Sequence, residues 1–188
     1  IGLAALILCF AWLVQLTVLS LLPVRAVLCS LPMMVTIVWG LVFGSPLQLP
    51  KGAELRLATI GQVVAMQALS GSLSGALVGA FFGSLYASIL PIYPICFPLI
   101  GWIAGYFCLR NFNQGGLLCV PLVLMLSVLA ETINAGQLAI IGRPDVFPHL
   151  VQFAVPEAIV NALIAPFVFY PMRVWYLFTR EQRKVVGA

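Results

Sequence analysis

Charged residues are scarce in this sequence, and their scarcity excludes an ordinary soluble domain. Asp, Glu, Lys and Arg make up only 7% of the 188 residues, whereas about a quarter of the residues in a soluble domain are charged. Hydrophobic residues account for 63% of the chain. Because so few polar groups are available to face water, the composition predicts an all-α integral membrane protein with the lipid bilayer as its solvent.

Histidine and closely spaced cysteines are also nearly missing, which argues against a metal site. His149 is the one histidine, and the five cysteines show no CxxC or other ligand-like spacing. The sequence has no HExxH, no GxSxG and no phosphate-binding glycine loop. It has no His, Cys and acid grouping that would activate a nucleophile. We therefore expect no metal, no cofactor and no enzymatic activity.

Apolar runs separated by short polar or proline-rich stretches divide the chain into predicted membrane spans. A helix needs roughly 20 apolar residues to cross a bilayer, so 188 residues accommodate a bundle of about six helices with short connections. Proline, glycine and charged residues stand between the runs. The predicted spans of this single transmembrane domain, residues 1–188, are 2–22, 26–44, 61–90, 95–109, 117–141 and 151–178.

The basic residues lie at the ends of these runs, which is a topology signal and not evidence of nucleic-acid binding. With six spans, both termini lie on the same side of the membrane. Seven basic residues then share that side, and only Arg25 and Arg143 lie opposite. By the positive-inside rule, the termini are predicted to be cytoplasmic. The seven are Lys51, Arg56, Arg110, Arg173, Arg180, Arg183 and Lys184.

Glycines recur at every fourth position in the third predicted span. They form one ridge almost free of side chains, which allows a neighbouring helix to approach closely in lipid. A shorter version of the pattern occurs in the fourth span. The pattern predicts either internal packing of the bundle or a docking surface for another protein. The glycines are Gly71, Gly75, Gly79 and Gly83 in the third span, followed by Ala87, and Gly101 and Gly105 in the fourth.

Polar residues interrupt the fifth predicted span in a single stripe. Glu131, Asn134 and Gln137 are spaced three residues apart, so they lie near one face of a helix. An ionised carboxylate inside a bilayer costs several kcal/mol, so Glu131 is expected to face the bundle interior or a partner. The stripe indicates either a hydrogen-bonded brace or a proton relay or substrate ligand.

The last span carries a second polar pair beside a proline. Glu157 and Asn161 are four residues apart and share a helix face, and Pro166 follows within the same run. Proline frees a backbone carbonyl and is expected to kink the helix there. Nearby polar side chains satisfy such freed groups, so structural bracing is the expected role.

Three segments of the sequence stand out together: the glycine-stepped GALVGAFFGSLYASILP, the acid-bearing AETINAGQLAI and the closing PEAIVNALIAPFVFYPMRVWY. Over roughly residues 71–176 they resemble MreD, a rod-shape-determining membrane protein family of bacteria. The patterns AETIxAxQ and NxxxxPxxxYP are most similar to cyanobacterial members. The chain departs from the family in lacking an aspartate at the end of the glycine-stepped helix, where Gly83 and Ala87 stand, and in a longer stretch over residues 47–70.

The resemblance implies a non-enzymatic scaffold in the bacterial inner membrane, within the cell-elongation complex that builds peptidoglycan. The implied partners are MreC, the actin-like MreB filament, and the RodA glycosyltransferase with its penicillin-binding transpeptidase. By this interpretation Glu131, Asn134 and Asn161 hold the bundle in shape. The glycine ridge or the lipid-facing surface would then dock the single membrane helix of MreC.

The alternative interpretation is a substrate-binding S component of an energy-coupling-factor vitamin transporter. Such a subunit is also a small bundle of about six helices, but it needs a pocket with convergent polar groups. The predicted exterior loops offer few such groups. They contain Arg25, the PIYP turn at 91–94, and Arg143, Asp145 and His149.

Overall fold

The computed structural model describes residues 9–11, 13, 14, 17, 30–44, 60–88, 91–107, 116–142, 148 and 150–186, and within these ranges it leaves out the side chains of 60–72, 153 and 180–186. Most of the first predicted span, the loops that carry Arg25, Lys51, Arg56, Arg110 and Arg143, and His149 lie outside the described residues.

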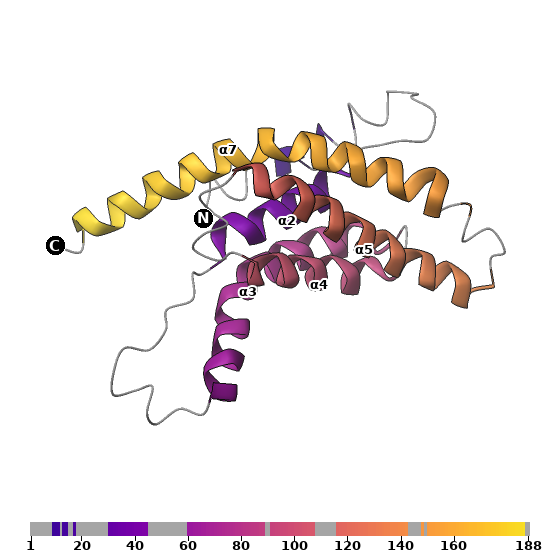
Figure 1. Ribbon diagram of the computed structural model, residues 1–188, viewed down its shortest axis with the longest axis horizontal. Coiled ribbons are helices and arrows are strands. Elements are labelled where there is room, and N and C mark those ends of the chain that lie inside the picture. The colour runs from indigo at the N-terminus through magenta and orange to yellow at the C-terminus, as the bar shows by residue number, and fades with distance from the viewer. Residues whose placement is uncertain are drawn as a thin grey trace.

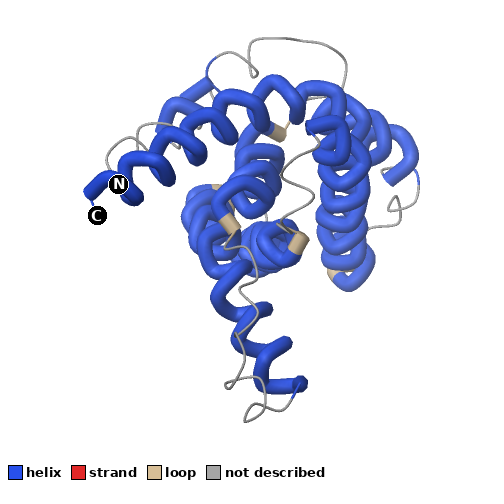
Figure 2. Tube along the Cα trace, turned by 60° about the vertical axis from the view of Figure 1, so that its left-hand side comes forward, coloured by secondary structure: helices blue, strands red, loops and turns tan. Residues whose placement is uncertain are grey.

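Every described element is helical, and none is a strand, as Figure 2 shows. The all-helical prediction is confirmed for this part of the chain. The longer elements are α2 (Leu31–Phe43), α3 (Ile60–Leu85), α4 (Tyr93–Tyr106), α5 (Cys119–Ile140) and α7 (Val155–Val186). A short 3-10 helix, η4 (Gly116–Leu118), precedes α5, and a short π-helix, η5 (Leu150–Ala154), precedes α7.

Helix α2 forms the centre of the bundle. Its residues 32–42 are all buried, as expected for a helix that is apolar on every side. It contacts α3, α4, α5 and α7, and α3 packs most extensively on α4 while α5 packs on α7. Figure 1 shows α7 along the top of the bundle and α5 sloping downwards beneath it. The core is therefore a short buried helix enclosed by four others.

Aromatic rings join the C-terminal end of α2 to α7. The ring centroids of Trp39 and Trp175 are 5.9 Å apart, and those of Phe43 and Trp175 are 5.1 Å apart. Tyr176 contacts Phe43 edge-on at 5.8 Å. Such edge-to-face pairs contribute about 0.5 to 1.5 kcal/mol beyond the area they bury, so this cluster fixes α7 against the core helix.

Two helical segments are long and apolar enough to cross a membrane, judged by length and composition: Gly116–Ile140 and Leu150–Thr179. Shorter apolar helices cover Leu31–Phe43, Leu73–Leu85 and Tyr93–Tyr106. The boundaries of the fifth and sixth predicted spans are close to the observed ones, except that α7 continues past residue 178 to Val186. The total of six spans stays a prediction.

Helix α7 contains both Pro166 and Pro171 and remains helical through them. It is bowed in Figure 1, arching over the other helices. A proline removes one backbone hydrogen bond and pushes on the preceding turn. The kink at Pro166 itself stays a prediction.

Candidate functional site

The glycine ridge of α3 is packed inside the bundle against α4. A Cβ atom built on Gly75 would collide with the backbone carbonyl of Gly101, and one built on Gly101 would collide with that of Gly75. A Cβ on Gly79 would collide with the carbonyl of Phe97. On Gly83 it would lie 2.6 Å from the carbonyl oxygen of Tyr93. These four glycines thus allow two backbones to touch.

Gly40 of α2 is a further member of this contact that sequence analysis missed. A Cβ on Gly40 would lie 2.8 Å from the carbonyl oxygen of Gly101 and 2.9 Å from the backbone nitrogen of Gly105. Gly105 itself is buried. An isolated glycine within an apolar run is the sequence signal for such a close approach. Gly71 lies in α3, among the residues whose side-chain surroundings are not described.

Both ends of the buried helix α2 are hydrogen-bonded to side chains of other helices. The backbone N–H of Ser30, at the start of α2, donates to Asn161 Oδ1 of α7 at 3.0 Å. At the other end, Ser74 Oγ of α3 donates to the carbonyl of Phe43 at 3.1 Å. Helix ends carry backbone groups without partners inside the helix. Because burial removes water from these ends, the two side chains supply hydrogen bonds that water would otherwise supply.

The start of α4 is held in the same way by α5. The backbone N–H of Ile92 donates to Gln137 Oε1 at 3.2 Å. Cys96 Sγ, one turn into α4, contacts the carbonyl of Ala130 at 3.7 Å. Gln137 and Asn161, which sequence analysis placed in separate helices, therefore perform the same task at two helix starts.

The two acids of α5 and α7 lie near these helix starts. Asn134 Nδ2 donates to Glu131 Oε1 at 3.3 Å, and Asn161 hydrogen-bonds the carboxyl group of Glu157. Glu131 and Glu157 lie near enough to influence each other electrostatically, and both influence Tyr93 of α4. The structure thus brings four of the five predicted polar residues into one cluster between α5 and α7, with Gln137 one turn away on α5.

Two buried oxygens of α5 have no hydrogen-bond partner among the described residues. They are Oγ of Ser127 and Oδ1 of Asn134, whose side chains are 2% and 5% exposed. Ser127, Glu131 and Asn134 are spaced by four and three residues, so they share the inner face of α5. The sequence analysis did not include Ser127. Its position four residues before Glu131 is the signal that would have added it to the polar stripe.

Metal-ligating side chains do not gather among the described residues. Within the described part of the chain, no group of three or more His, Cys, Asp or Glu side chains is placed to hold a metal ion. A cavity lined by Leu41, Leu118, Cys119 and Phe169 has a volume of about 10 Å³, roughly that of a single water molecule. The polar side chains instead hold helix ends and one another.

Comparison of the chain with models of known protein families, with curated proteins and with solved structures found no match.

Proposed function

We propose that this chain is a multi-pass protein of the bacterial inner membrane, similar to MreD, which acts as a non-enzymatic scaffold of the cell-elongation complex. Its proposed direct partner is MreC, whose single membrane helix it docks, and through MreC and RodA it joins MreB and the penicillin-binding transpeptidase. The observation that carries this proposal is the use of Asn161 and Gln137 to cap the starts of α2 and α4.

This use of polar groups favours a scaffold over a binding or catalytic subunit. A 13-residue helix such as α2 is about 20 Å long, shorter than the roughly 30 Å hydrocarbon core of a bilayer. Its ends would therefore lie within lipid depth, where an unsatisfied backbone group costs several kcal/mol. Side chains assigned to these ends are unavailable to a substrate.

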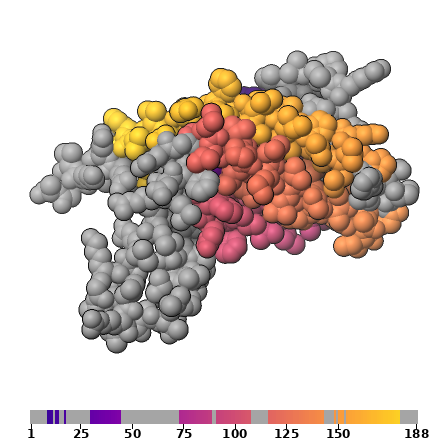
Figure 3. All heavy atoms as spheres, viewed as in Figure 1, coloured from indigo at the N-terminus to yellow at the C-terminus, as the bar shows by residue number. Residues whose placement is uncertain are grey.

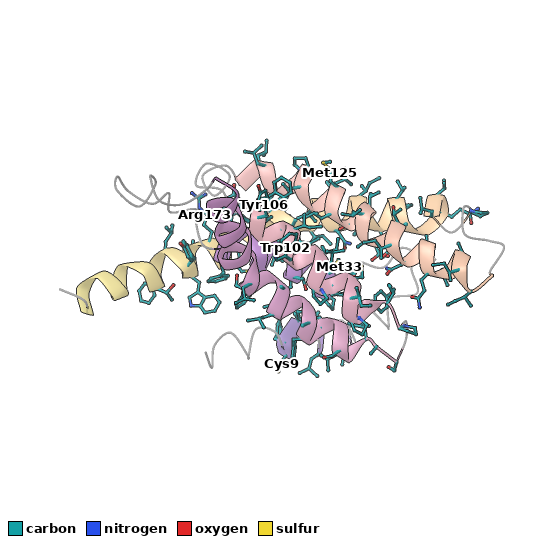
Figure 4. The ribbon with its side chains drawn as sticks, turned by 90° about the horizontal axis from the view of Figure 1, so that it is seen from below. Cys9, Met33, Trp102, Tyr106, Met125 and Arg173 are labelled. Atoms are coloured by element: carbon teal, nitrogen blue, oxygen red, sulfur yellow. The ribbon has the colours of Figure 1, made fainter. Side chains whose placement is uncertain are left out.

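The exposed helix surfaces suit recognition of another membrane helix. On α4, exposed apolar side chains recur at helical spacing, and α7 carries a second stripe on the opposite side from the core. In Figure 4, Met125 of α5 points away from the bundle, and its side chain is 71% exposed. The α4 stripe is Ile95, Leu99, Trp102 and Tyr106, and the α7 stripe is Ile159, Leu163, Phe167, Tyr170 and Val174.

Figure 3 shows α5 and α7 side by side on that face. Since the glycine ridge is already occupied by α4, we place the docking surface on these exposed stripes. A partner helix with large apolar side chains would pack there through van der Waals contact, which drives helix association in lipid.

The test is purification of the tagged chain from its native membrane in mild detergent, followed by mass spectrometry of the copurifying proteins. We expect MreC and RodA to be recovered in amounts comparable to the bait. Recovery of ATPase and coupling subunits, together with thermal stabilisation by a vitamin, would replace the proposal with the S component of a transporter. Recovery of neither set would refute the scaffold.

A further inference from the structure

The last turns of α7 continue past the part of this helix that is apolar enough to cross a membrane. Helix α7 has 32 residues and ends at Val186, whereas the apolar segment ends at Thr179. A helix of this length measures about 48 Å, and the hydrocarbon core of a bilayer measures only about 30 Å. Figure 1 shows the C-terminal part of α7 projecting past the other labelled helices. In a bilayer, the end of α7 therefore extends beyond the hydrocarbon core.

Basic residues are concentrated in these last turns. Arg180, Arg183 and Lys184 follow Thr179 closely, and Glu181 is the one acid among residues 180–186. Position 184 comes five residues after position 179, which is about 7.5 Å along the helix axis. The polar headgroup layer on each side of the hydrocarbon core is about 5 to 7.5 Å thick. The three basic positions therefore fall at headgroup depth.

The same turns of α7 are amphipathic. Val174 and Phe178 are one helical turn apart, and their side chains are 66% and 59% exposed. A helix turns by about 100° per residue, which places positions 180, 183 and 184 on the side of α7 away from position 178. Apolar groups on one side and Lys and Arg on the other are typical of a helix at the surface of a membrane.

We propose that Arg180, Arg183 and Lys184 form a binding surface for the phosphate groups of anionic phospholipids in the adjacent leaflet. Guanidinium and ammonium groups donate charge-assisted hydrogen bonds to phosphate oxygens, and basic residues next to a membrane span are attracted to an anionic surface. A zwitterionic phospholipid carries a compensating ammonium group, so the anionic lipid is preferred. The inference rests on the membrane location of the chain, but it is independent of the proposed partners.

The test reconstitutes the purified full chain in vesicles of equal parts phosphatidylcholine and phosphatidylglycerol. The protein is then extracted in mild detergent, and the phospholipids that it retains are quantified by mass spectrometry. We expect the ratio of phosphatidylglycerol to phosphatidylcholine in the retained lipid to exceed that of the vesicles by about fivefold, because each basic residue near an anionic surface adds to the attraction. A ratio equal to that of the vesicles would assign these charges to a protein partner or to water, and would refute the proposal.

Charge variants within the same turns locate the effect. Arg180→Gln, Arg183→Gln and Lys184→Gln together are expected to remove most of the excess of phosphatidylglycerol. Glu181→Gln is the matched control, and it is expected to keep or raise the excess because it removes an acid beside the basic residues. An unchanged excess in the triple variant would place the lipid elsewhere and overturn the assignment. Loss of the excess in Glu181→Gln would contradict a site based on positive charge.

Salt provides a second measurement on the unmodified chain, which decides if the triple variant does not fold. Exposed charges are strongly screened in about 0.5 M NaCl. We therefore expect the excess of phosphatidylglycerol to fall several-fold when extraction and washing are carried out at this concentration. An excess that is the same at low and high salt would show that the lipid is not held by exposed charges, and would refute the proposal.

Discussion

At the scale of single residues, the chain uses its few polar side chains where the backbone lacks partners. Asn161 is 1% exposed and bonds both the Ser30 N–H and the Glu157 carboxyl. Ser74 and Gln137 each satisfy one further helix end. A buried backbone group without a partner costs about 1 to 3 kcal/mol. Each of these few side chains therefore contributes substantially to the free energy of unfolding.

Replacing Asn161 with Leu tests this role, because the side chain keeps a similar size but loses both hydrogen bonds. We expect the free energy of unfolding to fall by about 2 kcal/mol or more, since the Ser30 N–H and the Glu157 carboxyl both lose a partner. The measurement is reversible unfolding in mixed detergent micelles. Ser84→Ala is the control, because its exposed hydroxyl bonds only the carbonyl of Phe81 in its own helix. Equal stability of the two variants would contradict the capping account.

At the scale of elements, the contact between α3 and α4 depends on glycine. No side chain fits where Gly75, Gly79 and Gly101 meet the opposite backbone. A side chain at any of these positions would push α3 and α4 apart, because the glycines lie along one line of contact between the two helices. Gly136 of α5 provides the contrast, since a Cβ built there meets nothing within 4 Å.

The pair Gly79→Ala and Gly136→Ala therefore gives opposite predictions from the same chemical change. Gly79→Ala is expected to lower the free energy of unfolding by about 2 to 3 kcal/mol through overpacking. Gly136→Ala is expected to raise it by up to about 1 kcal/mol, because alanine is the better helix former. Both values come from the same unfolding assay. A neutral Gly79→Ala variant would show that the helices are not in backbone contact.

The elements themselves were largely predictable from sequence, whereas their pairing was not. Apolar length and flanking prolines placed predicted spans 95–109, 117–141 and 151–178 close to α4, α5 and α7. The glycine spacing indicated close packing and favoured internal use slightly, but it left a docking surface open as the alternative. Choosing between them requires knowing that α4 lies against α3, a contact that no local pattern encodes. The cap from Asn161 to Ser30 joins residues 131 positions apart, so it too depends on the assembled bundle.

At the scale of the whole molecule, the described helices enclose a buried core helix and present apolar side chains on their outer faces. The core helix α2 is enclosed by its neighbours, and the small cavity beside Leu41 and Phe169 holds at most about one water. Large apolar side chains cover the outer faces of α4, α5 and α7. A molecule built in this way interacts with its surroundings through helix faces, which is the property the proposed scaffold requires.

The most direct test of that central claim is photo-crosslinking in native membranes. A photoreactive amino acid would replace Leu99 or Trp102 on the α4 stripe, and Leu163 or Phe167 on the α7 stripe, with unirradiated cells as the control. The account predicts a light-dependent adduct with MreC from one of these two stripes and not from the other. Adducts with lipid alone from all four positions, in cells that contain MreC, would contradict it.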